Sequence, residues 1–173
     1  DLVIFNRCDD NTNMGSFRRS IKAVNPRAQV GFERADGKEM EQDELLPYDV
    51  NAEVIKVEDE DYGIWYIDSL DHLDRYVGKN VQFTAMVMKP DGFPKDHFVP
   101  GRMAMTCCAE DMAFLGYACE FAGTKDLKQK EWVKVTAKVA REYFADYKGE
   151  GPVLHAISVE KAKAPKDPVI SFN

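Results

Sequence analysis

The strongest constraint on the fold is a two-residue alternation of apolar and polar side chains, which begins at Val81 and returns at Trp132. Successive side chains of a β-strand point to opposite faces, so this period is typical of strands with one buried face. The two segments are therefore predicted to be β-strands over 81–88 and 132–143. Their apolar positions are Val81, Phe83, Ala85 and Val87, then Val133, Val135, Ala137 and Val139.

Three further strands are predicted at 98–108, 115–121 and 153–161, with turns or polar connections between them. Five strands at such short spacing indicate a small antiparallel five-stranded barrel, and the order of their lengths suits an OB-like barrel. A β-sandwich is the competing architecture. Ser69 is expected to cap a lead-in helix over 70–76. The predicted fold class is mainly β, and α+β overall.

The chain divides at about residue 50 in this interpretation. Residues 1–50 are expected to form an N-terminal α/β extension, either separate from the barrel or part of the same domain. Residues 51–173 are expected to form the OB-like barrel domain with its lead-in strands and helix. The elements expected ahead of the barrel are strands over 2–5, 52–57 and 64–67 and helices over 17–24 and 39–46.

Charge and hydropathy exclude some classes of partner. The net charge is -7, and residues 1–75 carry 18 acidic and 9 basic side chains. Contact with phosphates needs clustered Lys and Arg, so no nucleic-acid partner is expected. The sequence has no apolar run of about 18 residues and no signal peptide. The missing initiator Met leads us to expect a processed protein or an excised fragment.

Cys107 and Cys108 are adjacent and make up half of the chain's four cysteines. One or both could be buried small apolar side chains. The pair could instead bind a soft metal or act as a reactive thiol site, or close a vicinal disulfide. Pairing with Cys8 or Cys119 is the remaining alternative. The sequence leaves these alternatives open.

A metal site at the cysteine pair would need further ligands, because zinc in proteins usually takes four from Cys, His and carboxylate groups. Asp111 lies three residues after Cys108, and His97 lies at the start of the same segment. The candidate metal site is therefore Cys107, Cys108, Asp111 and His97, with zinc or another soft metal as the alternative to no cofactor at all.

Catalysis has little support in the sequence. It has no Gly-x-Ser-x-Gly, no glycine-rich phosphate loop and no His-Glu-x-x-His. His155 is expected at a surface or satisfied position. The methionines near the cysteine pair are interpreted as core residues, although thioethers also bind Cu(I). We therefore expect a protein that is not an enzyme.

Four segments together resemble a known family. They read RYVGKNV at 75–81, FVPGRMAMTCCAED at 98–111, EWVKVT at 131–136 and APKDP at 164–168. The chain resembles the C-terminal soluble domain of uncharacterised bacterial subunits of a two-component membrane permease complex. The resemblance covers about residues 70–170, and its double-Cys segment is the most distinctive part.

The resemblance implies an accessory role at the cell membrane. Members of that family begin with membrane-spanning helices and are paired with a separate predicted permease subunit. It thus implies a binding or assembly module whose partner is the permease, and membrane attachment through segments absent from this chain. The family carries no catalytic residue over to this sequence, and the side of the membrane stays open.

Overall fold

Strands dominate the structure, as the alternation predicts. A computed structural model describes residues 1–40, 46–105 and 112–171. The strands are β1 (Leu2–Cys8), β2 (Gln29–Arg34), β3 (Val54–Lys56), β4 (Asn80–Met88), β5 (His97–Met105), β6 (Met112–Gly116), β7 (Cys119–Glu120), β8 (Trp132–Phe144), β9 (Gly149–Lys161) and β10 (Val169–Ser171). The α-helices are α1 (Met14–Val24) and α2 (Tyr62–Asp71), and four short 3-10 turns complete the elements.

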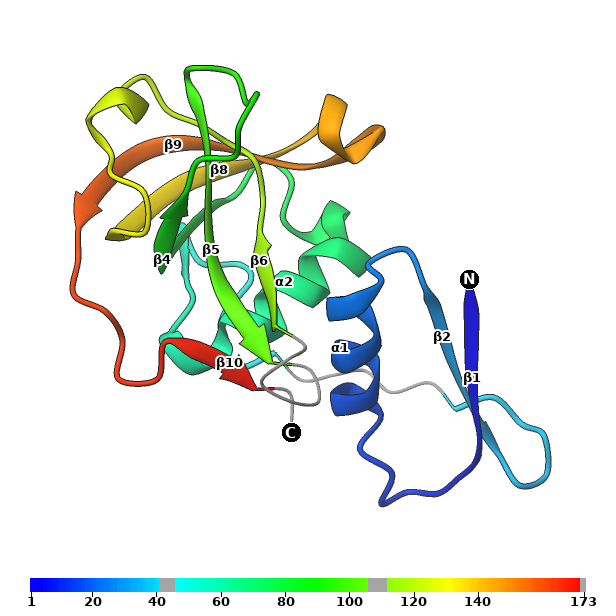
Figure 1. Ribbon diagram of the computed structural model, residues 1–173. Helices are drawn as coiled ribbons and strands as arrows, with labels where there is room; N and C mark the ends of the chain where they lie inside the picture. Colours follow the sequence, from blue (N-terminus) through cyan, green and yellow to red (C-terminus); the bar gives the residue numbers. More distant parts are fainter. Residues whose placement is uncertain (41–45, 106–111, 172–173) are drawn as a thin grey trace.

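Five strands close into a ring-like sheet. The hydrogen-bonded order runs β5, β7, β9, β8 and β4, and β4 pairs again with β5 (Figure 1). The long antiparallel pair of β8 and β9 forms one wall of the ring. β6 pairs with the same edge of β5 as β7 does. β3 pairs in parallel with β4, and β10 pairs in parallel with β5. Ring closure leaves few strand edges open within the described part of the chain.

The predicted mainly β class is confirmed, and the strands expected for the barrel form a ring-like sheet close to their expected ranges. The segment expected as one strand over 115–121 is split into β6 and β7. The pairing of β7 with β9 is parallel and spans two residue pairs, so the ring is not antiparallel throughout. An OB-like closure is therefore not established by this sheet.

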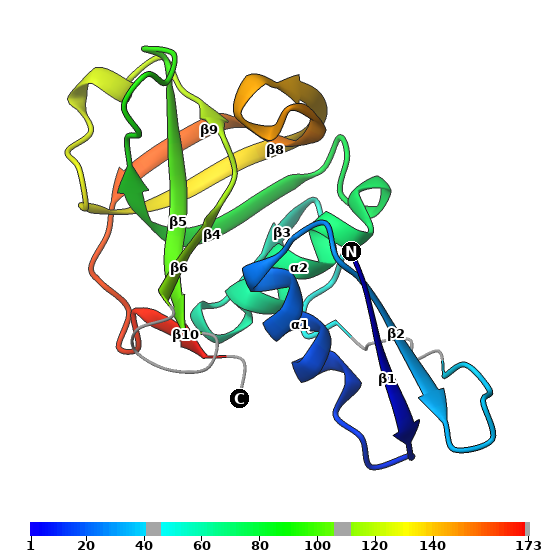
Figure 2. The same cartoon turned by 45° about the vertical axis from the view of Figure 1, so that its right-hand side comes forward.

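The core lies inside the ring and against α2. Inward side chains of β4 and β8, such as Phe83 and Val135, are 2% and 0% exposed. Trp65 of α2 packs on Phe83 with ring centroids 4.8 Å apart. α2 lies across one end of the ring (Figure 2). The strand expected over 64–67 and the helix start at Ser69 are wrong, because a short apolar run cannot distinguish a strand from a buried helix.

A buried arginine fixes the end of β5 to the segment before α2. Arg102 is 1% exposed and points inward. Its Nε donates to the Thr84 carbonyl oxygen at 2.9 Å, and its Nη2 pairs with the Asp59 carboxylate. The guanidinium also lies 5.3 Å from the ring centre of Tyr62 and 5.8 Å from that of Trp132. These contacts satisfy a charge that would otherwise be costly to bury.

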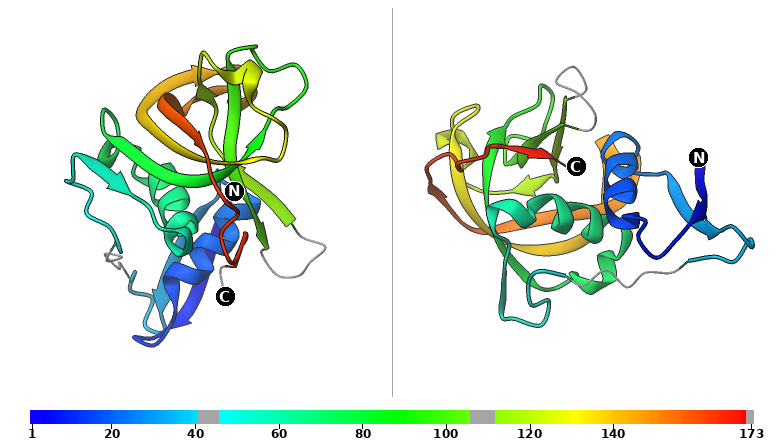
Figure 3. Two further views of the ribbon diagram at one scale, coloured as in Figure 1. Left: turned by 90° about the vertical axis from the view of Figure 1, so that its left-hand side faces the viewer. Right: turned by 90° about the horizontal axis from the view of Figure 1, so that it is seen from below.

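The N-terminal module consists of β1, α1 and β2. β1 and β2 form a two-stranded parallel sheet of their own. α1 lies between this pair and the rest of the molecule (Figure 3). The helix begins earlier than residue 17 because the Asn13 side chain accepts a hydrogen bond from the Ser16 N–H and caps it.

Two features of the module differ from the sequence interpretation. β2 was not expected, since its short segment shows little alternation. The helix expected over 39–46 is wrong at its start, because Met40 donates its N–H to the Phe32 carbonyl oxygen as an extended segment beside β2. The rest of that helix lies outside the described residues.

Candidate functional site

Only one of the four residues expected at the metal site lies in the described part of the chain. Cys107, Cys108 and Asp111 lie outside the described residues. His97 lies at the first residue of β5, eight residues before Met105 at its other end. At the usual rise of a strand, eight residues span about 26 Å. β5 therefore places His97 far from the end at which the cysteine pair follows.

His97 has other partners. Its Nδ1 lies 2.8 Å from the Asp96 carboxylate, and its ring lies 5.6 Å from that of Phe144. The hydrogen bond to His97 lowers the pKa of Asp96. Cys8 and Cys119 are buried free thiols. No group of three His, Cys, Asp or Glu side chains within residues 1–40, 46–105 and 112–171 is arranged to hold a metal ion.

The methionines near the cysteine pair do not fill the core. Their side chains are half-buried, on positions that alternate with the inward ones of β4 and β5. Met105 and Met112 lie opposite each other in the pairing of β5 with β6. These two residues flank the segment that contains Cys107 and Cys108. The interpretation of these methionines as core residues is wrong.

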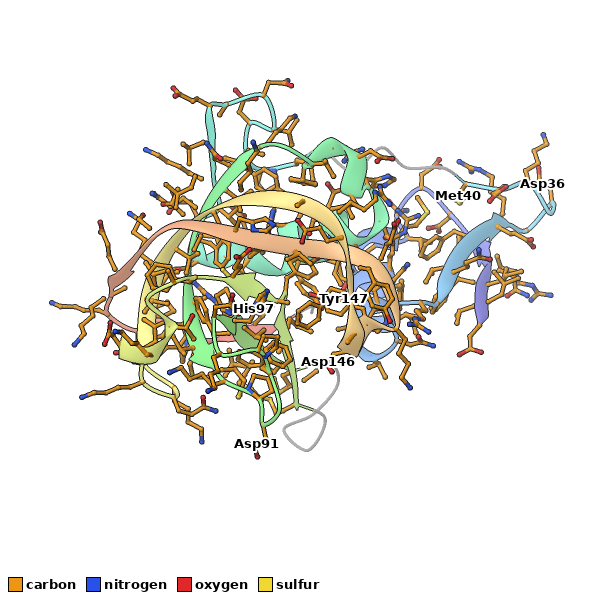
Figure 4. The ribbon with its side chains drawn as sticks, turned by 90° about the horizontal axis from the view of Figure 1, so that it is seen from above. Asp36, Met40, Asp91, His97, Asp146 and Tyr147 are labelled. Atoms are coloured by element: carbon orange, nitrogen blue, oxygen red, sulfur yellow. The ribbon has the colours of Figure 1, made fainter. Side chains whose placement is uncertain are left out.

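A cavity of about 450 Å³ lies where the N-terminal module meets the ring-like sheet. We call it the seam cavity. Its walls come from the turn after α1, from α2 and from the far end of the β8–β9 hairpin. The residues that matter most in it are Arg27, Tyr66, Tyr117, Arg141, Asp146 and Tyr147. Seen from above, Tyr147 and Asp146 lie between the ring and the module, whereas Asp36 and Met40 lie at the module's far end (Figure 4).

Two tyrosines of the seam cavity are fully bonded within the protein. The Tyr147 hydroxyl accepts from the Ala118 N–H at 2.7 Å and donates to the Pro152 carbonyl oxygen at 3.0 Å. Burial, opposed by the Ala118 hydrogen bond, raises the pKa of Tyr147 to about 12. The Tyr117 hydroxyl donates to the Tyr66 carbonyl oxygen at 2.6 Å and lies 2.7 Å from Ser69 Oγ. These hydroxyls shape the cavity but have no hydrogen-bond donor left to offer a ligand.

Tyr66 is the exception. Its ring stacks on that of Tyr117, with centroids 4.7 Å apart and planes 19° apart, and the residue is 7% exposed. Its hydroxyl has no hydrogen-bond partner among the described residues. Burial raises the pKa of Tyr66, so the phenol stays neutral and can donate a hydrogen bond at physiological pH. Among the described residues, the buried side-chain donor without a partner is Trp65 Nε1, so the Tyr66 hydroxyl is accessible and opens into the cavity that it lines. A neutral donor that opens into a cavity is typical of a ligand site.

The charged groups around the seam cavity differ in what they already bind. Arg27 donates to the Tyr147 carbonyl oxygen at 2.6 Å, and Arg141 pairs with Asp74 at 2.6 Å. Asp146 and Glu150 also line the cavity and are exposed. The rim thus carries both signs of charge around an aromatic floor. Such a lining suits a binding site.

A second polar group lies on the outer surface of the ring. His155 of β9 has Nδ1 2.7 Å from the Glu120 carboxylate and Nε2 2.6 Å from that of Glu142. Burial lowers the pKa of His155, but the hydrogen bonds and charges of Glu142 and Glu120 outweigh it, so the pKa is raised. Lys138 lies opposite His155 on β8. The expectation of a satisfied His155 is confirmed, and this group joins three strands where β7 and β9 pair over two residues.

The seam cavity could not be predicted from the sequence because its walls are far apart in the chain. Arg27, Tyr66 and Tyr147 become neighbours only through the fold. Tyr66 falls in a segment predicted to be a strand, and from that prediction its stacking on Tyr117 could not be anticipated. The tyrosines at 117, 143 and 147 are the one weak signal of an aromatic site in the sequence.

Comparison with known proteins places the chain in a family. The model of the DUF1980 C-terminal domain matches residues 32–171. The chain belongs to the DUF1980 C-terminal domain family. The match begins within β2, so it contains the whole ring-like sheet and α2 but leaves β1 and α1 outside. This DUF1980 C-terminal domain is a domain of unknown function, and the family itself assigns no permease partner.

One curated relative of the domain is similar over part of its length. The UPF0703 protein YcgQ of Bacillus subtilis (strain 168) is 25% identical over 95 residues. Those residues make up 55% of this chain and 33% of YcgQ, so the chain spans about a third of that relative. Across the described ranges, no helix has the length and apolar character needed to cross a membrane.

Proposed function

We propose that this DUF1980 C-terminal domain is an accessory binding module of a membrane permease complex, without catalysis of its own and without a cofactor. In this proposal the ring-like sheet acts as an OB-like barrel, and the seam cavity receives a segment of the permease subunit. The domain binds no nucleic acid and is held at the cell membrane by segments outside this chain. The permease partner rests on the family resemblance of the four sequence segments.

The unpaired Tyr66 hydroxyl is the observation that carries the binding site. The hydroxyl is accessible from the seam cavity and is bonded to no described residue, so its donor is available to a bound segment. The neighbouring hydroxyls of Tyr117 and Tyr147 are fully bonded, so the fold is able to satisfy such groups in this region. A carbonyl or carboxylate oxygen of a bound segment would satisfy Tyr66. The aromatic floor would contribute apolar contact area to the same segment.

Co-purification with the permease subunit tests this proposal. Leu70→Trp would fill the cavity from the α2 side and is expected to abolish capture of the permease from detergent-solubilised membranes. Val24→Trp places the same bulk on a residue that is 70% exposed and is the matched control. Capture that survives in a folded Leu70→Trp variant, or transport that is unchanged when the domain is deleted, would contradict the proposal.

A soft-metal or thiol site at the cysteine pair is the second candidate function. Its specific support is that Met105 and Met112 lie opposite each other at the two ends of the segment holding Cys107 and Cys108. Thioether and thiolate sulfurs together favour Cu(I) and zinc-like metals. Elemental analysis of reduced protein, with and without Cys107→Ser and Cys108→Ser, tests it. Metal content that is zero, or unchanged by both substitutions, would refute it.

A further inference from the structure

The N-terminal module has a sheet that is unfinished on one side. β1 and β2 pair in parallel, with Val3 opposite Val30 and Phe5 opposite Phe32. Parallel sheets in proteins are normally covered by helices on both faces, and a two-stranded sheet alone is marginally stable. The module therefore has too few strands for the kind of sheet it forms.

One face of this sheet is covered and the other is bare. On the covered face, Phe5 packs against Phe17 and Phe32, with ring centroids 5.0 Å and 5.3 Å apart. On the opposite face, Leu2 is 62% exposed and Ile4 is 50% exposed. Side chains alternate along a strand, so Leu2 and Ile4 lie on the face opposite Phe5, which contacts Phe17 of α1. α1 stands between the sheet and the ring (Figure 1).

The two edges of the sheet also differ. The outer edge of β2 is partly occupied, because Met40 donates to the Phe32 carbonyl oxygen and Arg34 to that of Lys38, both at 2.8 Å. No strand in the described ranges pairs with the outer edge of β1. The Asp1 carbonyl oxygen accepts a hydrogen bond from the Gln29 N–H of β2. Alternate residues of a strand direct their N–H and C=O groups to opposite edges, so those of Leu2 and Ile4 point to the open edge.

We propose that the open edge of β1 takes a further parallel strand, and the bare face takes a helix, both from an α/β segment of the same polypeptide. The module then forms the end of a larger α/β sheet. The first four residues of β1 are apolar and have neither Pro nor charge, whereas Arg7 and the register irregularity between Phe5 and Cys8 come only at the other end of the strand. The first half of this edge therefore lacks the features that keep natural edges unpaired. The inference concerns β1 and does not depend on the seam cavity or on a permease.

A second copy of the chain fits the surface less well. The β1 edges of two copies would pair antiparallel about a two-fold axis perpendicular to the sheet. Such an axis places the bare faces of the two copies on the same side of the joined sheet. The four-stranded sheet would then gather two Leu2 and two Ile4 side chains on one uncovered face. A strand followed by a helix covers both the edge and the face, and adjacent parallel strands are usually joined in this way within one chain. YcgQ likewise extends well beyond the region that it shares with this chain.

Amide hydrogen exchange on the polypeptide as encoded by its gene, compared with the 173-residue chain, tests the proposal. The Ile4 amide is expected to exchange on the order of 100-fold more slowly in the encoded polypeptide, as for a newly paired strand. The Phe83 amide of β4 is the control and should not change. Ile4→Lys should speed exchange at Leu2 about tenfold in the encoded polypeptide and leave the 173-residue chain unchanged.

Three results would overturn the inference. One is an Ile4 amide that exchanges equally fast in both proteins. Another is protection of Ile4 in the 173-residue chain that rises with protein concentration, because a second copy would then occupy the edge. The third is a reading frame in which a membrane-spanning helix, and no strand–helix pattern, leads directly into residue 1. None of these results bears on binding at Tyr66, so the two proposals fail separately.

Discussion

The ring-like sheet and the N-terminal module are both built from apolar strands, but the ring pairs most of its strand edges and the module leaves one edge and one face uncovered. In the ring, the hydrogen-bonded path returns to β4, and α2 covers the enclosed core. In the module, three buried residues form a separate small core, and one face and one edge stay open. Closure of the ring pairs its strand edges within the domain, whereas a two-stranded parallel sheet needs further strands and helices to cover its edge and face.

The boundary between the two regions is where the candidate site lies. Lys22 of α1 pairs with Asp71 of α2 at 2.6 Å, and Arg27 reaches the Tyr147 carbonyl oxygen. The seam cavity opens beside these contacts. A site between a rigid ring and a less complete module can adjust to a bound segment more easily than a site inside the ring.

The largest expected effect is a glycine substitution within the ring. A Cβ on Gly101 would overlap the Leu115 carbonyl oxygen and lie 2.6 Å from Phe114 Cε1. Gly101→Ala is expected to lower the free energy of unfolding by at least about 3 kcal/mol, because the backbone of β6 must move. In the module, a Cβ on Gly31 meets Ile4 Cγ1 at 3.9 Å, so Gly31→Ala should stay within about 0.5 kcal/mol. Urea unfolding of both variants measures the contrast, and equal losses would argue against it.

Truncation of one phenylalanine in each region tests whether they unfold separately. Phe32 and Phe98 are 1% and 0% exposed, in the module and the ring respectively. Phe32→Ala should cost about 3 kcal/mol locally, so amides of β2 lose protection while the fluorescence transition of Trp65 is unchanged. Phe98→Ala should shift that transition. A common shift in both variants would show that the two regions unfold as one unit.

The His155 group should give the ring a small pH dependence. The pKa of His155 is raised in the folded chain by Glu142 and Glu120, so its contribution is complete below the unfolded pKa of about 6.5 and is lost as pH rises through the folded pKa. All three side chains are more than a third exposed, which limits the effect to a few tenths of a kcal/mol up to about 1 kcal/mol.

His155→Gln isolates this contribution. The difference in unfolding free energy between wild type and variant should be largest near pH 5.5 and should shrink toward pH 8.5. Amides of the module serve as the internal control, because the two ion-pair partners of His155, Glu120 and Glu142, belong to the ring. A difference that grows with pH would contradict the assignment.

The sequence predicts the ring better than it predicts the site. Val81 to Val87 and Val133 to Val139 alternate because each strand has one buried face, so the strands could be placed from local pattern alone. Arg102 interrupts that pattern with a charged residue. Only the fold shows that its guanidinium bonds the Thr84 carbonyl oxygen and pairs with the Asp59 carboxylate. The Glu120–His155–Glu142 contact depends on strand register, which no local pattern specifies.

The seam cavity depends on tertiary contacts in the same way. Tyr66 could be recognised only once α2 was known to be a helix packed on Tyr117. The expected site at Cys107, Cys108, Asp111 and His97 stays a prediction for its first three members, while β5 carries His97 to the opposite end. The adjacent cysteines therefore mark a distinctive segment of the sequence, but they do not by themselves establish a metal site.

Binding of the permease subunit to Tyr66→Phe protein tests the central claim most directly. The substitution removes the hydroxyl without a partner, so folding should be unaffected, and the Kd should rise about tenfold as one buried hydrogen bond is lost. Tyr143→Phe removes the hydroxyl of a tyrosine that is 69% exposed and lies outside the cavity, and its Kd should match wild type. A folded Tyr66→Phe variant that binds as tightly as wild type would contradict the account.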